Sequence, residues 1–495
     1  MERNPKIERR LHALLSIILV ALPLITIYVI FHFRGPQWDL IAHSLLGRTA
    51  LNYIALHNVN IHPAFIGEYL NNLVYYNEPY RAPLATPIFA TLSVFFSETV
   101  LPYMVIVYAA AVLALYKTGR ALRIDTLILF AAFLNPYALY FFFVPNGMEG
   151  LSIIFVLLGI TALAKRSSTS GIFFGLASLA KYPAIIFLPL IILLWDRKKI
   201  TFAATFEFLM LLPWLLFNYI VYGNPIYSYL AAVSNVITSG GYAAVHPLAV
   251  LAVVAYPAAF AAAAFVLWHR RHGRLNVRIG YRGKVLLAFA ALALVGYAFV
   301  LPHNDFFTQE RFGYLFFTAL VLLSVSFLSK ETMHKAAAKR NIAIIAIAIL
   351  CVGLAYTYIT SNTAIVKYYN PNNPDNIYQA AYGQLSNLGF ENCRFITNAW
   401  VPMLYQQMSA YSPFVRYSSS VITPIVAHLS NASGIGYANF SNNFAKYPII
   451  VIQNAGVPEQ FIIGLKNSTL KYNSGYIQIY LPKNATCYPA NLTEA

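Results

Sequence analysis

The chain has 495 residues, of which 59% are hydrophobic and only 10% are charged, and its formal net charge is +17. One soluble core cannot bury this much apolar side chain, so the composition excludes an ordinary soluble protein and indicates a polytopic membrane protein embedded in a lipid bilayer. The positive charge does not indicate nucleic-acid binding, because the basic residues form short clusters between apolar stretches instead of one basic face.

Apolar stretches recur from residue 11 to residue 360, and most are long enough to cross a hydrocarbon core of roughly 30 Å at about 1.5 Å per helical residue. The first, residues 11–31, follows four basic residues and lacks a small-residue cleavage pattern, which predicts a retained anchor and not a cleaved signal peptide. Further spans are expected near residues 99–116, 126–143, 149–164, 201–221, 247–268, 285–301, 312–329 and 341–360.

Basic clusters between the apolar stretches predict the orientation, because Lys and Arg are enriched on the cytoplasmic side. They lie at residues 3–10, 117–123, 165–166, 197–199, 270–284 and 330–340. Successive clusters on one side require an even number of crossings between them. The preferred topology has a cytoplasmic N-terminus and places the part after residue 360 outside the plasma membrane.

Two segments leave the number of crossings open. Residues 83–97 are short and are expected to lie along the outer interface, and the sequence Lys181-Tyr182-Pro183 divides residues 171–195 into a hairpin of two half-length helices. This arrangement gives eleven transmembrane helices. In the alternative, each segment is one full span, which moves five basic residues to the outside but keeps the N-terminus inside and the tail outside.

The first external loop, residues 32–98, contains the acid of greatest interest, Asp39. Apolar residues at helical spacing follow it, so Asp39 is expected to begin a surface helix. It is either a helix cap or an ionised base that receives a proton. Candidates for substrate or phosphate contacts in the same loop are His43, Glu78 and Arg81.

Other candidates lie between later spans, on the same predicted side. Glu149 borders an apolar run, where an acid is usually functional or paired. Lys181 at the hairpin tip is either a cation for a phosphate or a side chain that reaches harmlessly to the interface. The third external turn contains Asp305, Glu310 and Arg311, which either bind substrate or mark the water boundary.

The tail, residues 361–495, is expected to be a small extracytoplasmic α/β domain, because helical patterns at 375–388 and 399–408 alternate with strand-like runs at 394–397, 449–452 and 476–480. It contains no nucleophile elbow or phosphate loop, so support or acceptor binding is expected of it. Its five Asn-x-Ser/Thr sequons are glycosylation candidates if the tail is external: Asn431, Asn439, Asn467, Asn484 and Asn491.

The chain has three cysteines without the spacing of a metal site. A disulfide between Cys393 and Cys487 is chemically permitted outside the cell, but sequence cannot show whether they are close enough. We expect neither a metal nor a cofactor.

The order of several motifs along residues 10–330 resembles the GT-C superfamily of integral-membrane glycosyltransferases, which includes protein O-mannosyltransferases and the aminoarabinose transferase of lipid A. The matching stretches are Gln37-Trp38-Asp39, Tyr80-Arg81-Ala82-Pro83-Leu84, Asn146-Gly147-Met148-Glu149, Gly175-Leu176-Ala177-Ser178-Leu179-Ala180-Lys181-Tyr182-Pro183 and Glu310-Arg311-Phe312-Gly313-Tyr314. Leu40 stands where protein O-mannosyltransferases have a second acid, and the Trp-Trp-Asp signature of oligosaccharyltransferases is absent.

The resemblance implies inverting transfer of mannose, or another hexose or pentose, from a polyprenyl-phosphate donor to a hydroxyl of a glycan, lipid or protein acceptor. Asp39 would be the general base, Glu149 would orient a substrate, and Lys181, Arg311 or Arg81 would hold the donor phosphate. The alternative is a transporter, a flippase or a non-catalytic scaffold of polymer export. Internal repeats are frequent in transporters, and this sequence has none.

Overall fold

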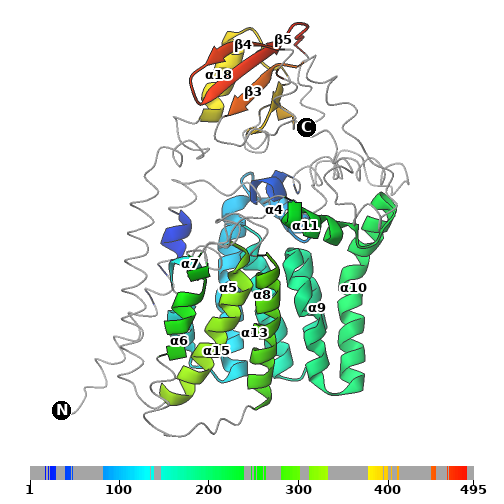
Figure 1. Ribbon diagram of the computed structural model, residues 1–495, viewed down its shortest axis with the longest axis vertical. Coiled ribbons are helices and arrows are strands. Elements are labelled where there is room, and N and C mark those ends of the chain that lie inside the picture. The colour runs from blue at the N-terminus through cyan, green and yellow to red at the C-terminus, as the bar shows by residue number, and fades with distance from the viewer. Residues whose placement is uncertain are drawn as a thin grey trace, which may run out of the picture. The chain divides into compact units, whose positions relative to one another are not determined.

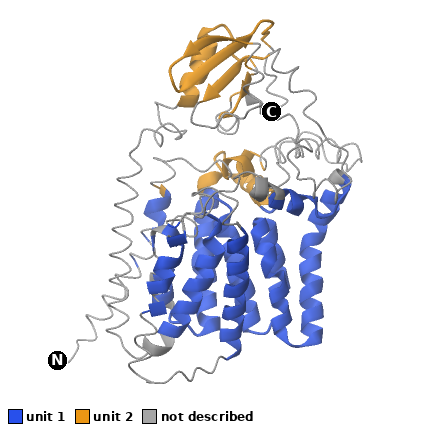
Figure 2. Cartoon of the chain, viewed as in Figure 1, with its two compact units in different colours: residues 1–27, 80–84, 102–359 blue, residues 28–79, 85–101, 360–495 orange. Residues whose placement is uncertain are grey.

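The fold is that of a computed structural model, which describes residues 17, 21, 23–28, 40–45, 47, 82–133, 135–138, 147–238, 247, 250–251, 253–259, 261–262, 280–300, 311–332, 377–393, 395–399, 403, 408, 410–411, 447–452, 465 and 468–487. The chain forms two compact units (Figure 2). Unit 1 comprises residues 1–27, 80–84 and 102–359, and unit 2 comprises residues 28–79, 85–101 and 360–495. The sequence-based division into residues 1–360 and 361–495 stays a prediction, and it groups residues 28–79 and 85–101 of unit 2 with the transmembrane module.

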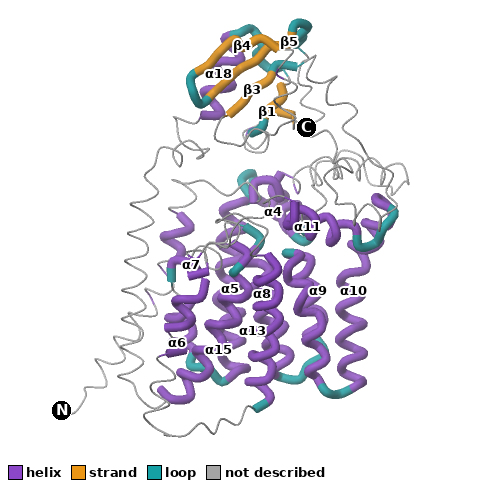
Figure 3. The backbone as a smooth tube through the Cα atoms, viewed as in Figure 1, coloured by secondary structure: helices purple, strands orange, loops and turns teal. Residues whose placement is uncertain are grey.

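Unit 1 is a bundle of helices, most of which run side by side (Figures 1 and 3). The helices are α5 (Val100–Leu122), α6 (Thr126–Phe133), α7 (Pro136–Ala138), α8 (Glu149–Ala164), α9 (Ser170–Ala180), η3 (Tyr182–Leu194), α10 (Arg197–Tyr222), α11 (Tyr227–Thr238), α13 (Tyr281–Val300) and α15 (Tyr314–Thr332). Most follow the apolar stretches of the sequence, because a helix satisfies its own backbone hydrogen bonds where side chains are apolar.

Three of the described helices are long and apolar enough to cross a membrane: residues Val100–Leu122, Arg197–Ile220 and Tyr281–Phe299. The coarse class, mostly helical with helices long and apolar enough to cross a membrane and with a small sheet, therefore holds for the described residues, whereas the count of eleven transmembrane helices remains a prediction. The spans predicted at 11–31, 247–268 and 341–360 lie largely or entirely outside the described residues.

The predicted span at residues 126–143 is interrupted in the structure. Helix α6 ends at Phe133, and the Asn135 side chain bonds the backbone on both sides: its Nδ2 donates to the Ala132 carbonyl at 3.1 Å and its Oδ1 accepts from the Ala138 N–H at 2.9 Å. Pro136 cannot donate a backbone hydrogen bond, so it favours a new helix start over continuation.

The predicted break inside residues 171–195 is present. Helix α9 ends at Ala180, Lys181 is extended with φ −156° and ψ 121°, and the 3-10 helix η3 begins at Tyr182. The cause is local, because Pro183 disfavours a helical conformation in the residue before it. Helix α9 packs against α8, α10 and η3, which places this break within the bundle.

Glycines on one face of α9 allow α10 to approach closely. A Cβ on Gly171 would lie 1.9 Å from the Ala203 carbonyl oxygen, and a Cβ on Gly175 would lie 2.9 Å from the Cβ of Met210. Four-residue spacing puts both glycines on the same face, as in close helix contacts within membranes. This contact fixes α9 against α10 and thereby supports Lys181 at the end of α9.

Unit 2 contains helix α4 (Ala85–Phe95), helix α18 (Ile377–Asn387) and a five-stranded sheet. The sheet order is β2 (Ala410–Tyr411), β1 (Phe395–Thr397), β3 (Ile449–Ile452), β5 (Ile477–Pro482) and β4 (Ser468–Asn473). Strands β2, β1 and β3 are parallel, and β5 pairs antiparallel with both β3 and β4. The predicted small α/β tail is confirmed for α18, β1, β3 and β5, whereas sequence did not predict β2 or β4.

A buried apolar cluster forms the core of unit 2. It contains residues of α18, β1, β3 and β5, together with Ile41 and Ala42 from a helical segment at residues 40–45.

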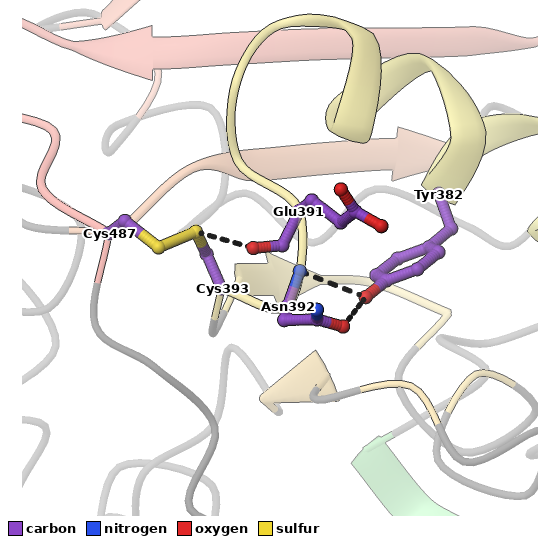
Figure 4. Close-up of a disulfide and its surroundings, with 5 residues drawn as sticks. All are labelled: Tyr382, Glu391, Asn392, Cys393 and Cys487. Carbon is purple, nitrogen blue, oxygen red and sulfur yellow. Dashed lines mark hydrogen bonds between the residues drawn. A yellow bond between two sulfur atoms is a disulfide. The ribbon is translucent and has the colours of Figure 1, made fainter.

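Helix α4 is only 11 residues long, about 16 Å at the helical rise, which is too short for a full span. Cys393 and Cys487 form a disulfide with a Cα–Cα distance of 5.1 Å (Figure 4).

Candidate functional site

Glu149 is the first residue of α8 and the centre of a charged cluster in unit 1. Its side chain is 3% exposed, and its Oε1 lies 2.9 Å from Lys181 Nζ and 2.5 Å from Arg311 Nε. Lys181 comes from the α9–η3 break, and Arg311 lies just before α15. Three segments that are distant in sequence therefore meet at one carboxylate oxygen.

Within the described residues, the single carboxylate of Glu149 pairs with two cations. A buried carboxylate needs a partner, and Glu149 has two cations. Both cations are more accessible than the acid, with side-chain exposures of 18% for Lys181 and 26% for Arg311. An ammonium has three N–H groups and a guanidinium has five, so each cation can bond more than one acceptor. The cluster is therefore suited to bind an anion on its accessible side.

The backbone around Lys181 is held on both sides. The Leu179 carbonyl accepts a hydrogen bond from Leu84 N–H at 3.0 Å, and the Lys181 carbonyl accepts one from Ala184 N–H at 3.0 Å. Lys181 N–H itself donates to the Ala177 carbonyl at 3.0 Å. The break in the helix is thus an ordered turn that presents the lysine side chain to Glu149.

An aromatic cluster adjoins this turn. Tyr182, the residue after Lys181, is buried, accepts a hydrogen bond from Trp214 Nε1 at 3.1 Å and contacts the Tyr229 ring at a centroid distance of 4.7 Å. Tyr229 belongs to α11, which lies across the ends of α9 and α10 (Figure 1). Burial raises the pKa of Tyr229, so its hydroxyl stays protonated and pairs with Ser178 Oγ at 3.2 Å.

Two buried tyrosines lie near Glu149. The Tyr103 hydroxyl, from α5, donates to the Gly147 carbonyl at 3.5 Å and thereby contacts the turn that begins α8. Tyr314, at the start of α15, is 1% exposed and follows Arg311 by three positions. Glu149 is thus surrounded by buried side chains, whereas Lys181 and Arg311 are the more accessible members of the cluster.

The structure unites three of the predicted site residues: Glu149, Lys181 and Arg311. His43 lies in the 40–45 helix of unit 2 and is buried, at 3% exposure, which does not fit an accessible substrate contact. The remaining candidates of the predicted site lie outside the described residues: Asp39, Glu78, Arg81, Asp305 and Glu310.

Sequence reasoning did not identify the supporting residues around the cluster. Tyr103, Trp214 and Tyr229 lie in apolar helical stretches, where aromatic residues are ordinary core residues. Only Tyr182 carried a local signal, through its position between Lys181 and Pro183. Among the described residues, no group of three or more His, Cys, Asp or Glu side chains could hold a metal ion.

Comparison of the chain with family models, curated proteins and solved structures finds no match in any of the three. The functional interpretation therefore depends on the charged cluster and on the order of the sequence motifs.

Proposed function

We propose that the chain is an integral-membrane glycosyltransferase that transfers a sugar, mannose or another hexose or pentose, from a polyprenyl-phosphate donor to an acceptor hydroxyl on the outer membrane face. The observation that carries this proposal is the Glu149–Lys181–Arg311 cluster. It combines one buried acid with two partly exposed cations inside a bundle of apolar helices. An amphiphilic phosphate ester presents the matching chemistry, an anionic head on an apolar chain.

The spacing of the two cations suits one phosphate group. Lys181 Nζ and Arg311 Nε contact the same oxygen of Glu149, at 2.9 Å and 2.5 Å, so they lie close to each other. A single phosphate can therefore accept hydrogen bonds from both. Such charge-assisted bonds are about twice as strong as neutral ones. Lys181 and Arg311 together can neutralise the phosphodiester of the donor and the phosphate monoester that leaves, without a metal ion.

The proposed reaction is a single displacement. The acceptor hydroxyl oxygen forms a bond to the anomeric carbon while the bond from that carbon to the phosphate oxygen breaks. Polyprenyl phosphate leaves with the bonding electron pair, and Lys181 and Arg311 stabilise the negative charge that grows on it. Asp39 receives the proton of the hydroxyl as general base. A single displacement inverts the anomeric configuration.

The resemblance implied that Glu149 orients a substrate, but we propose a different role for it here. Because it bonds both cations, we assign it to positioning Lys181 and Arg311. Without a fixed acid, two cations this close would repel each other and separate. Glu149 thereby keeps the phosphate site formed before the donor binds, which lowers the ordering cost of binding.

A transporter or flippase for a phosphorylated lipid is the second candidate, because ion-paired residues among apolar helices also occur on substrate pathways. A non-catalytic scaffold would retain the cluster without transferring sugar. Transfer distinguishes both from the enzyme, since neither forms a new glycosidic bond.

The proposal is tested by transfer of radiolabelled sugar from polyprenyl-phosphate donors to extracted membrane acceptors by the purified full chain. Asp39→Asn is expected to abolish transfer, and Lys181→Gln and Arg311→Gln to raise the donor KM and lower kcat, because both cations bind the donor phosphate and stabilise the charge that grows on it. The matched control is Lys198→Gln, an exposed lysine at the start of α10. Absence of transfer by the wild type across several donors and acceptors would contradict the enzyme and favour transport or scaffolding.

A further inference from the structure

The proposed transfer reaction does not use the sequons of the tail. One of them, Asn484-Ala485-Thr486, lies entirely within the described residues, just after β5. Strand β5 ends at Pro482, and the Ala485 N–H donates to the Pro482 carbonyl at 3.0 Å, which closes a turn. Asn484 and Thr486 are both exposed. The amide and the hydroxyl that define the sequon are therefore accessible on a turn at the protein surface.

The disulfide supplies a second, independent observation. Cys487, three positions after Asn484, is bonded to Cys393 (Figure 4). Disulfides form and persist in oxidising compartments outside the cytosol. N-linked glycans are added to sequons in surface segments of proteins on the same side of the membrane. The bond and the sequon thus point to one location for this part of the chain.

The β4–β5 pair favours Asn484 over the neighbouring sequon at Asn467. The second and third residues of that sequon, Ser468 and Thr469, lie in β4 and pair with Pro482 and Leu481. Asn467 itself lies outside the described residues. The described residues of both sequons therefore lie at the same end of the strand pair, but Thr469 is fixed in the sheet ladder, whereas Thr486 follows the turn and lies outside the sheet.

We infer that Asn484 carries an N-linked glycan. An oligosaccharyltransferase of the cell supplies the reaction, with a lipid-pyrophosphate-linked oligosaccharide as co-substrate. The amide nitrogen of Asn484 bonds to the anomeric carbon, the carbon–oxygen bond to pyrophosphate breaks, and the lipid pyrophosphate leaves with the electron pair. The amide nitrogen gives up one proton to the transferase. This modification does not depend on any activity of the chain itself.

A glycan at this place lies beside the edge of the sheet. Among the described strands, β4 is the outermost on the side of β5, and Leu470 within it is 43% exposed. Exposed edge strands are sites of unwanted strand pairing between molecules. A bulky, hydrated glycan two residues beyond Pro482 would hinder such pairing at this end of β4.

The test is mass spectrometry of the full chain produced in cells that carry out N-glycosylation. Release of the glycans with peptide N-glycosidase in heavy-oxygen water converts a glycosylated Asn into labelled Asp, and fragmentation separates Asn484 from Asn491. We expect labelled residue 484 in the wild type and in Thr486→Ser, which retains a sequon. Asn484→Gln and Thr486→Val should lose the label at this position and still contain the Cys393–Cys487 disulfide.

Unmodified Asn484 in chains that contain the disulfide would overturn the inference, because the segment would then be outside and still not be an acceptor. Reactive thiols at Cys393 and Cys487 together with unmodified Asn484 would overturn it as well, by placing the tail in a reducing compartment. Neither result bears on sugar transfer by the chain, so this inference and the proposed function fail separately.

Discussion

If Glu149 is a buried, ion-paired acid, removing its charge should restore the stability that is lost when both of its cations are removed. Glu149 is almost fully buried, whereas Lys181 and Arg311 reach solvent. Loss of one cation leaves the acid bonded to the other, so Lys181→Met and Arg311→Met should each destabilise the chain modestly, by about 1–2 kcal/mol. Loss of both leaves an unpaired buried carboxylate, for which about 3–5 kcal/mol is expected.

Adding Glu149→Gln to the Lys181→Met, Arg311→Met double variant removes the buried charge and should recover most of that loss. The measurement is the thermal unfolding midpoint of the purified chain in one detergent for all single, double and triple variants, treated as a coupling cycle. Lys198→Met is the matched control, since Lys198 is exposed at the start of α10. A double variant as stable as the wild type, or a triple variant no more stable than the double, would refute the assignment of Glu149 as a buried, ion-paired acid.

Three further perturbations test the surroundings of the site and unit 2. Trp214→Phe removes the hydrogen bond to Tyr182, so we expect the free energy of unfolding to fall by about 1 kcal/mol and the donor KM to rise at unchanged kcat. A change in kcat alone would count against a role of Trp214 in positioning Lys181. Gly171→Leu places a side chain against the Ala203 carbonyl and should lower the free energy of unfolding by about 1–3 kcal/mol or more. The control Gly383→Ala in α18, with open space around the glycine, should be neutral or stabilising. Equal unfolding midpoints for the two variants would refute the close contact of α9 and α10. Cys393→Ser opens a loop of 94 residues, so faster proteolysis of the tail and a loss of about 4 kcal/mol are expected; unchanged protease resistance would show that the disulfide adds little to unit 2.

Sequence predicted those elements whose cause is local. The β3 strand was assigned at the residues where it occurs, 449–452, because a continuous β-branched run between polar segments is typical of a buried strand. Strand β4 was missed, because its sequence alternates weakly and the strand lies at the exposed sheet edge. The interruption at Asn135 was also missed, because the surrounding residues are uniformly apolar.

By itself, the sequence determined the apolar helices, the break at Lys181, the three-residue proximity of Asn484 to Cys487 and the unusual position of Glu149 beside an apolar run. Each depends on hydropathy, proline geometry or order along the chain, which are properties of neighbouring residues. Only the tertiary structure decided that Arg311, 162 positions away, shares the Glu149 oxygen with Lys181. Such a contact depends on how α8, the α9–η3 turn and the segment before α15 meet. The desolvation of Glu149 likewise depends on all the side chains packed around it, which come from several parts of the chain.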